Sequence, residues 1–571
     1  MSLKQERVFY VQQMLIFVIY PLYFLLLKII RIYYLRALIN LKNPMKHALL
    51  SITLTLTVLF SFSQTISTTL FGQNAWMPSW AYNGKLDAIW QKAAPANFEI
   101  IRIGGIDYED NFDEHIDDFM RFIDSIKFTC GAEPILQIPR NYSAEQTTAL
   151  YQLINVTNTK DVKYWSIGNE PDYHLPNTLA EISDYFVRIA KALKDQNDSL
   201  VVIGPDYANY WVHPGDEWDA GKTVYKDFIN SVGLEMNSDS TAYLLDVFSF
   251  HNYVGYTIDA NIDNQDIKRV LTNINIALNQ INSTRIVGLA NKASWGIGEF
   301  NINQTISDNT KPWSFYNGQY LAMIYGLGME KGATFICPWS LIEGEYRKST
   351  DLSMFENEAN DFTPRSSFWH VKMLSDNRRA NFMKSTSSQK LVKTIAMKDE
   401  TGSTLMILNT DETNGYATQI KLNTKITTSD DLNVNIDAGF DMEYRDLIPP
   451  NSTVTIVFDA TGQFISKTLY TKEDADNFNA PQLANLVPTK IRPLEEQSPA
   501  PYFQNETNTL IFDQPLNNEF KEVRIIDVSG KVIFQKTTSQ NSIQLNDLKK
   551  GIYVVSIQST LQTRNSKFVK P

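Results

Sequence analysis

The chain has 571 residues and a net charge of −11, with an isoelectric point near 5.2. This length suits two or three domains, and the acidic balance argues against a nucleic-acid partner. The chain has two cysteines, Cys130 and Cys337, and six scattered histidines, without an HExxH or CxxC motif. We therefore expect no disulfide scaffold, no metal centre and no other cofactor.

Two apolar segments open the chain. Residues 8–40 are apolar and aromatic with interspersed Lys and Arg, and a second apolar run covers 49–62. Residues 45–63 have the form of a signal peptide, because Met45-Lys46-His47 precedes the apolar core and small residues stand at −3 and −1 before Gln64. The sequence thus predicts that translation starts at Met45 and that 1–44 is an upstream over-extension. A membrane anchor at about 10–31 is the alternative.

Apolar runs then alternate with amphipathic segments over residues 64–375. The expected strands are 70–76, 98–104, 134–139, 162–169, 200–204, 247–251, 295–300 and 334–339. Helical patterns lie between them, for example at 112–126, 144–154 and 179–195. Eight strands in this alternation predict an α/β fold, a (β/α)8 TIM barrel. The alternative is an open doubly wound sheet, but no Gly-rich phosphate loop follows the first strand.

The pattern changes after about residue 390, where short strands follow one another without helices. The expected strands are 391–397, 404–409, 417–422, 432–436 and 453–458. They predict an all-β sandwich over 376–460. Residues 461–500 are polar and contain several prolines, which is typical of a linker. Residues 501–571 are expected to form a small C-terminal β domain, with a hairpin that turns at Ser529-Gly530.

Two glutamates mark the candidate active site. Glu170 ends the fourth expected strand in Trp-Ser-Ile-Gly-Asn-Glu-Pro, and Glu299 lies near the end of the seventh in Gly-Ile-Gly-Glu-Phe-Asn. In a TIM barrel the C-terminal ends of all strands meet at one face, where such enzymes carry out their chemistry. Two carboxylates that face each other across a sugar can break a glycosidic bond. The motifs therefore predict a glycoside hydrolase.

This pair of motifs resembles glycoside hydrolase clan A, the retaining (β/α)8 glycosidases with catalytic glutamates on strands four and seven. The resemblance implies that Glu170 is the acid/base and Glu299 the nucleophile. It also implies substrate-binding or supporting roles at the ends of other strands, for Asn169, Arg102, His251, Tyr253 and Trp339. For Arg102, His251 and Trp339, a purely structural role is the alternative.

Further aromatic side chains follow the expected strands and are candidates for sugar contacts: Trp76, Tyr173 and Trp211. Aromatic loops favour an extended cleft for a polymer. We therefore expect a secreted, retaining, endo-acting hydrolase of a plant or algal polysaccharide, acting as a monomer on a polysaccharide or oligosaccharide. The alternatives are an exo-acting glycosidase and a surface carbohydrate-binding protein with a decayed site.

The last 70 or so residues carry a second resemblance. The elements Asp527-Val-Ser-Gly-Lys-Val-Ile533, Gly551-Ile-Tyr-Val-Val555 and the terminal Lys567-Phe-Val-Lys-Pro571 occur in this order. They resemble the C-terminal sorting domain of the type IX secretion system of Bacteroidetes. The resemblance implies contact with that secretion machinery, and secretion or attachment to the cell surface at the outer membrane. An immunoglobulin-like accessory domain is the alternative.

Overall fold

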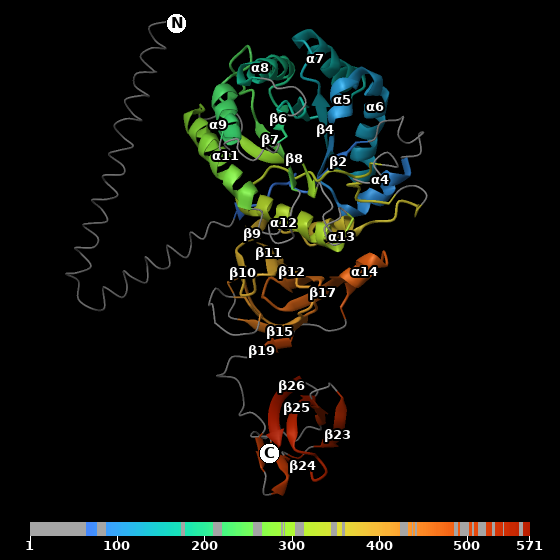
Figure 1. The fold of residues 1–571 in the computed structure, drawn as a ribbon. Helices are drawn as coiled ribbons and strands as arrows, with labels where there is room; N and C mark the ends of the chain where they lie inside the picture. The colour runs from blue at the N-terminus through green and yellow to red at the C-terminus, as the bar shows by residue number, and fades with distance from the viewer. Residues whose placement is uncertain are drawn as a thin grey trace, which may run out of the picture. The chain divides into compact units, whose positions relative to one another are not determined.

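A computed structural model describes most of the chain after residue 63 (Figure 1). The described residues are 64–76, 87–172, 178–208, 220–254, 265–286, 289, 292–302, 313–343, 351–356, 360–422, 432–436, 438–439, 442–484, 489–491, 502–504, 507–511, 521–527, 531–538, 540, 542–558 and 563–570. The predicted over-extension or anchor and the predicted signal peptide lie outside them. Within the described ranges, no helix is both long and apolar enough to cross a membrane.

Seven strands form one parallel sheet in chain order. They are β2 (Gly72–Ala75), β3 (Ile100–Ile103), β4 (Glu133–Ile138), β5 (Tyr164–Ile167), β6 (Val201–Tyr207), β7 (Val247–Val254) and β8 (Ser294–Ile302). The predicted eighth strand, 334–339, is not a regular strand. It closes the barrel through parallel bridges from Ile336 to Phe71 on one side and to Ile297 on the other. The predicted TIM barrel is therefore confirmed (Figure 1).

Helices surround this sheet (Figure 1). They include α4 (Asp87–Ala93), α5 (Ile106–Asp110), α6 (Ile116–Asp124), α7 (Ala144–Tyr151), α8 (Leu179–Gln196), α9 (Ala220–Val232), α11 (Gln265–Thr284), α12 (Phe315–Lys331) and α13 (Ser366–Ser375). Their starts follow local chemistry. Helix α8, for example, begins with a capping box in which Thr178 and Glu181 satisfy each other's backbone N–H groups.

The barrel interior changes character along its axis because side chains alternate between the two faces of each strand. Near the strand starts, Ile100, Ile135 and Val247 belong to an apolar cluster with Phe335 and Cys337. Two residues further along the same strands stand Arg102, Gln137 and Ser249, all buried. One apolar layer thus supports a polar layer above it, toward the C-terminal ends of the strands.

The β-sandwich consists of two sheets. One has the order β1-β9-β11-β12-β16-β17-β18 and the other β10-β14-β13-β15-β19. The strands are β1 (Gln64–Thr65), β9 (Asn381–Met383), β10 (Ser385–Ser387), β11 (Val392–Asp399), β12 (Gly402–Asn409), β13 (Tyr416–Lys421), β14 (Leu432–Ile436), β15 (Glu443–Ile448), β16 (Ser452–Asp459), β17 (Phe464–Thr471), β18 (Gln482–Leu483) and β19 (Thr489–Ile491). All five predicted strands are present.

The predicted linker at 461–500 is wrong in its first part. Strand β17 pairs with β16 along nearly its whole length, and helix α14 (Lys472–Asp476) follows it directly. Strands β18 and β19 then add to the edges of the two sheets. The sandwich also takes β1 from the other end of the chain, since Gln64 pairs with Phe382. The sandwich therefore extends beyond the predicted range 376–460 at both ends.

Helices α12 and α13 join the barrel to the sandwich. Gln319 donates to the carbonyls of Asn409 and Ser452, both at 3.2 Å. His370 lies 2.8 Å from the hydroxyl of Thr453, and burial lowers the pKa of His370 to about 4, which keeps the imidazole neutral. Helix α12 is buried on nearly all sides because it packs against both units.

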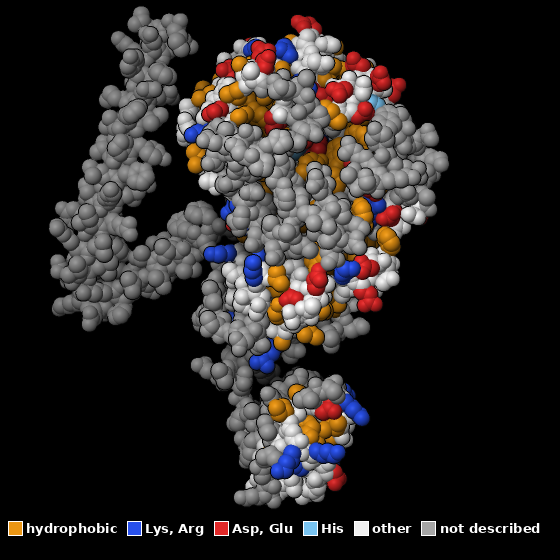
Figure 2. Space-filling view, viewed as in Figure 1, with side chains coloured by type: hydrophobic (Ala, Val, Ile, Leu, Met, Phe, Trp, Pro, Cys, Tyr) orange, Lys and Arg blue, Asp and Glu red, His pale blue; other side chains and the backbone are white. Residues whose placement is uncertain are grey.

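The C-terminal unit is a small β structure with its own apolar core. One sheet has the order β20-β21-β24 and the other β23-β22-β25-β26. The strands are β20 (Tyr502–Gln504), β21 (Thr509–Ile511), β22 (Lys521–Asp527), β23 (Val532–Thr538), β24 (Ser542–Gln544), β25 (Gly551–Gln558) and β26 (Thr563–Lys570). The predicted hairpin is the β22–β23 pair. On the face seen in Figure 2, Lys and Arg gather on this unit, whereas Asp and Glu are spread over the barrel.

Candidate active site

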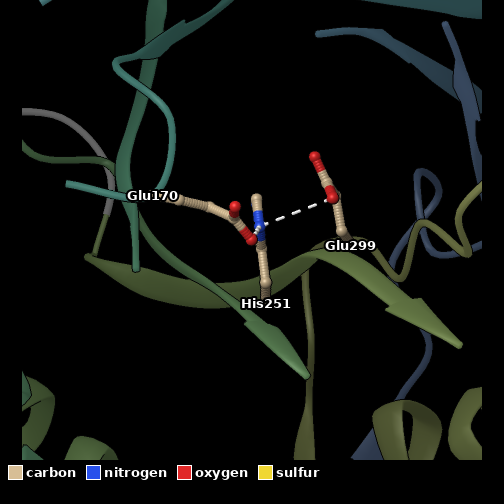
Figure 3. A group of neighbouring side chains, drawn as sticks. All are labelled: Glu170, His251 and Glu299. Carbon is tan, nitrogen blue, oxygen red and sulfur yellow. Dashed lines mark hydrogen bonds and ion pairs between the residues drawn. The ribbon is translucent and has the colours of Figure 1, made fainter. Parts of the chain in front are cut away.

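Glu170 and Glu299 face each other from different strands, with His251 between them (Figure 3). Glu170 follows β5 with a left-handed backbone (φ 44°), and its N–H donates to the carbonyl of Asp206 at 2.9 Å. His251 Nδ1 lies 2.9 Å from Glu170 Oε1 and 3.6 Å from Glu299 Oε2. Nδ1 of His251, a residue of β7, is therefore shared between the carboxylates of Glu170, which follows β5, and Glu299, which lies in β8.

Arg102, on β3, is the centre of the charged network. Its guanidinium donates to Glu299 Oε1 at 2.8 Å and to Asp206 Oδ2 at 3.0 Å. It also donates to the amide oxygens of Asn74 (3.0 Å) and Asn169 (2.9 Å). Burial by itself lowers the pKa of Arg102, but the charges of Asp206 and Glu299 raise the pKa above its ordinary value, so the guanidinium stays charged.

The second oxygen of Glu299 is held by Tyr253. The phenol of this β7 residue donates to Glu299 Oε2 at 2.7 Å. Burial, together with the charges of Glu299 and Glu170, raises the pKa of Tyr253 well above its ordinary value, so the phenol keeps its proton. Glu299 thus has a fixed donor on each oxygen, which orients its carboxylate.

Asp206, at the end of β6, is a charged residue that the sequence did not single out. It is fully buried and accepts hydrogen bonds from Ser166 (2.6 Å) and Ser249 as well as from Arg102. Burial alone raises the pKa of Asp206, but Arg102 and then His251 lower it below its ordinary value. Asp206 is therefore an anion that helps to balance Arg102, and its Oδ1 lies 4.0 Å from His251 Nε2.

A second set of residues supports Arg102 from behind. Gln137, on β4, accepts from Arg102 Nη2 at 3.2 Å and from the N–H of Gly105 at 2.7 Å. Its amide nitrogen donates to Glu109 Oε2 at 3.0 Å, while the N–H of Arg140 donates to Glu109 Oε1 at 2.9 Å. Burial raises the pKa of Glu109 to about 7. A chain of contacts therefore runs from Glu109 through Gln137 and Arg102 to Glu299.

Trp339 is held against a second indole. Its ring lies 6.2 Å, centroid to centroid, from that of Trp76, and its Nε1 donates to Glu343 Oε1 at 2.7 Å. The peptide between Trp339 and Ser340 is cis. A side chain at Gly105 would clash with the Trp339 ring. The Trp339 indole can therefore occupy this position only because residue 105 is a glycine.

The same cluster offers the donors that a metal ion would need. Glu170, His251 and Glu299 each present one ligand atom, and these atoms all lie within 4.8 Å of one another. Carboxylate oxygens and an imidazole nitrogen suit zinc or a similar transition metal. To bind there, an ion would have to displace the contacts that join His251 to the two glutamates.

The structure thus brings together Arg102, Asn169, Glu170, His251, Tyr253 and Glu299, and it pairs Trp76 with Trp339. Tyr173 and Trp211 lie outside the described residues. The sequence interpretation missed Asn74, Gln137, Glu109, Asp206 and Glu343. A signal existed for Asn74 and Gln137, because each is a polar residue within an apolar run and a buried polar group needs partners.

Comparison with known proteins separates the two ends of the chain. Residues 504–571 match the secretion system C-terminal sorting domain, as the sequence predicted. No curated protein is similar in sequence to this chain at a significant level.

Solved structures resemble a large part of the chain in fold. An α-L-arabinofuranosidase from Thermotoga maritima, in complex with arabinose, has a TM-score of 0.51 and 12% identity over 75% of this chain and 95% of its own. A family 51 α-L-arabinofuranosidase from Bifidobacterium longum has the same TM-score and identity over 75% and 92%. A family 44 xyloglucanase from Paenibacillus polymyxa has a TM-score of 0.47 and 13% identity over 70% and 98%. The chain therefore combines a barrel whose fold resembles that of these two arabinofuranosidases with a C-terminal segment that matches a secretion sorting domain.

Proposed function

We propose that this protein is a retaining glycoside hydrolase, exported by its sorting tail, that cleaves a plant or algal polysaccharide by endo-attack. The observation that carries the proposal is the pair of glutamates at the ends of β5 and β8, joined through His251. The clan A-like barrel and the sorting tail are consistent with it, and the arabinofuranosidases with a similar fold act on carbohydrate, as their names state.

The distance between the carboxylates supports retention of configuration. Their facing oxygens lie within 4.8 Å of each other. Retaining enzymes keep the two carboxyl groups roughly 5–5.5 Å apart, whereas inverting enzymes leave about 6.5–9.5 Å for a water. The separation favours direct attack by one carboxylate over attack by an interposed water.

In the first step, Glu299 attacks the anomeric carbon while the bond to the leaving oxygen breaks and Glu170 gives that oxygen a proton. In the second step, Glu170 takes a proton from water, the water oxygen bonds to the anomeric carbon, and Glu299 leaves. Arg102 and Tyr253 hold Glu299 as an oriented anion. Because Asn169 Oδ1 already accepts from Arg102, its Nδ2 is the group that would donate to the sugar's 2-hydroxyl.

The support for a polymer substrate comes from the sequence, in which aromatic residues follow several strands of the barrel. Trp339 and Trp76 would form an apolar floor against which a pyranose face can stack. The sorting tail implies contact with the secretion machinery and delivery outside the cell or onto its surface, where such polymers are met.

The decisive test combines product analysis with stereochemistry. The enzyme would be incubated with a panel of cellulose, xylan, mannan, agarose and arabinan, with Glu299→Gln as the blank. We expect oligosaccharides from one polymer, absent from the blank, and proton NMR should show the anomer of the substrate as the first product. Initial release of the opposite anomer would overturn the retaining mechanism. Release of monosaccharide alone would replace endo-attack by exo-attack.

A further inference from the structure

A cavity outside the candidate active site lies beside the barrel, where the barrel meets the sandwich. Its volume is about 270 Å³, just below the range of roughly 300–1,000 Å³ common for small-molecule sites. The walls include Trp313, Glu356 and Arg365 from the barrel, and Lys472 and Phe478 from the sandwich. The catalytic network described above does not use any of these five residues.

Topology places this cavity on the catalytic side of the barrel. Trp313 lies in the connection between β8, which carries Glu299, and helix α12. Glu356 and Arg365 lie in the next connection, between the closing segment 334–339 and α13. In a TIM barrel such strand-to-helix connections leave the face where the active site is built. The opposite wall is formed by α14 and the residues after it.

Two large aromatic side chains are exposed at this cavity. Trp313 is 36% exposed and Phe478 is 53% exposed. The guanidinium carbon of Arg365 lies 6.0 Å from the Trp313 ring centroid, and Arg365 is fixed by Asp351 and Glu356, both at 2.6 Å. The indole is therefore backed by an immobilised cation, a rigid arrangement for a residue that remains open to solvent.

Phe478 stands on a strained backbone. Its φ is 54°, in the left-handed region that a bulky residue rarely adopts. The preceding helix α14 is held by a capping box between Thr471 and Asp474. The N–H of Asn479 donates back to the carbonyl of Asp474 at 2.8 Å. The chain thus maintains a strained turn that presents an exposed ring at the cavity, which points to binding.

We propose that this cavity, the Trp313–Phe478 pocket, is a glycan-binding subsite that holds one or two sugar units of the same polysaccharide chain that Glu170 and Glu299 cleave. The inference rests on the proposed function. The indole and phenyl faces would stack on the apolar faces of pyranose rings. Glu356, Lys472 and Asp476, which also line the cavity, offer acceptors and donors for the sugar hydroxyls. Because the pocket lies on the catalytic side of the barrel, it is placed to hold part of a polymer that is bound at Glu170 and Glu299.

Affinity electrophoresis in the Glu299→Gln background tests binding without turnover. Each polysaccharide of the panel would be cast in a native gel, and retardation would be measured for the parent and for added Trp313→Ala or Phe478→Ala. We expect each change to weaken binding to one polymer about three- to tenfold, and Phe478→Tyr to retain it. The matched control is Phe128→Ala, since Phe128 is 83% exposed on the π-helix η3 (Ser125–Cys130), away from this pocket.

Kinetics of the active enzyme separate this proposal from the proposed function. With Glu299 intact, Trp313→Ala should raise KM for the polymer and leave kcat/KM for a short aryl glycoside unchanged. Retardation by none of the polymers, or equal retardation of parent and variants, would overturn the subsite. If the protein cleaves no polymer but Trp313→Ala abolishes retardation by one of them, the pocket binds glycan and the proposed function is wrong.

Discussion

The two ends of the barrel contain similar chemical groups in different arrangements. At the C-terminal end, the buried Arg102 holds Glu299, with Glu170 and His251 facing the same carboxylate. At the N-terminal end, Arg378 lies 2.9 Å from Glu99 beside a cavity of about 540 Å³, twice the volume of the Trp313–Phe478 pocket.

The difference lies in the partners of each carboxylate. Glu99 accepts the backbone N–H of Phe71 at 3.0 Å, while Arg378 also donates to the carbonyl of Ser67 at 2.8 Å. Glu99 therefore ties the segment before β2 to the segment after α13, which is a structural task. Among the described residues, the side chains of Arg102 and Tyr253 hold Glu299, and Glu299 shares His251 with a second glutamate. The feature that distinguishes the candidate active site is therefore a pair of facing carboxylates that share one imidazole.

The strongest test of this contrast replaces one glutamate at each end by its neutral isostere. Glu299→Gln should lower kcat by about 10⁴-fold or more, because an amide is a poor nucleophile and loses the charge that Arg102 holds. Glu99→Gln should leave kcat unchanged. Both variants should keep the wild-type circular dichroism spectrum. Comparable losses of activity in both would mean that the two ends are not functionally distinct.

The second test removes one carboxylate from each end altogether. Glu170→Ala should lower kcat by about 10²–10⁴-fold on polysaccharide, and less on aryl glycosides whose leaving group needs no proton. Azide should restore part of this activity, because a small anion can enter the vacated space and attack the glycosyl-enzyme. Glu133→Ala, in the cavity at the N-terminal end, should neither lose activity nor respond to azide. Failure of azide to act on Glu170→Ala would count against the acid/base assignment.

The contrast also explains how much the sequence could predict. Strand-to-helix alternation identified the barrel. The places of Glu170 and Glu299 near the ends of two expected strands, together with the clan A resemblance, identified the candidate site. Glu299 reaches the interior through a bulge between β7 and β8, which the two-residue period of a strand does not predict. The fifth expected strand ends at residue 204, but β6 continues to Tyr207, so Asp206 lies beyond the expected strand. Its role as a buried counter-ion depends on three other strands, and local sequence does not contain that information.

Two strands of the sandwich, β15 and β17, were also not predicted from the sequence. Residues 464–471 alternate weakly between apolar and polar residues, and the average composition of 461–500 concealed this pattern. Strand β15 carries Glu443, Arg445 and Asp446 and was missed because its charged side chains mask the alternation. Strand β17 is stabilised by the hairpin that it forms with β16, and β15 by pairing with β13 across an intervening strand. These pairings outweigh the weak local preference of each segment.

A smaller effect on catalysis is expected from Glu109, which contacts Arg102 only through Gln137. Glu109→Gln should lower kcat/KM about tenfold at pH 8, the effect of one lost hydrogen bond to a charged group. The ionised carboxylate accepts from the Gln137 amide and so turns its oxygen toward Arg102. The pKa of Glu109 is raised to about 7, chiefly by burial, so wild type and variant should converge toward pH 5. An equal loss at every pH would indicate a packing defect instead of positioning.

The last prediction concerns stability instead of catalysis, and it compares one buried carboxyl group from each end. Burial raises the pKa of Glu99 to about 7, above its ordinary value of 4.5, against the opposing effects of Phe71 and Arg378. A carboxyl group with a raised pKa in the folded state binds its proton more tightly there. The stability that it contributes is therefore present below about pH 4.5 and lost as the pH rises through 7.

Glutamine cannot titrate, so the free energy of unfolding of wild type minus that of Glu99→Gln should fall by about 3 kcal/mol between pH 4.5 and pH 8. Glu109→Gln should show a shift of the same sign, because burial raises both pKa values. Urea unfolding across this pH range measures both. If the two carboxyl groups differ as their partners indicate, the variants will share this stability signature, and only Glu109→Gln will change the pH profile of kcat/KM. A change of that profile in Glu99→Gln would show that the N-terminal end is coupled to the chemistry after all.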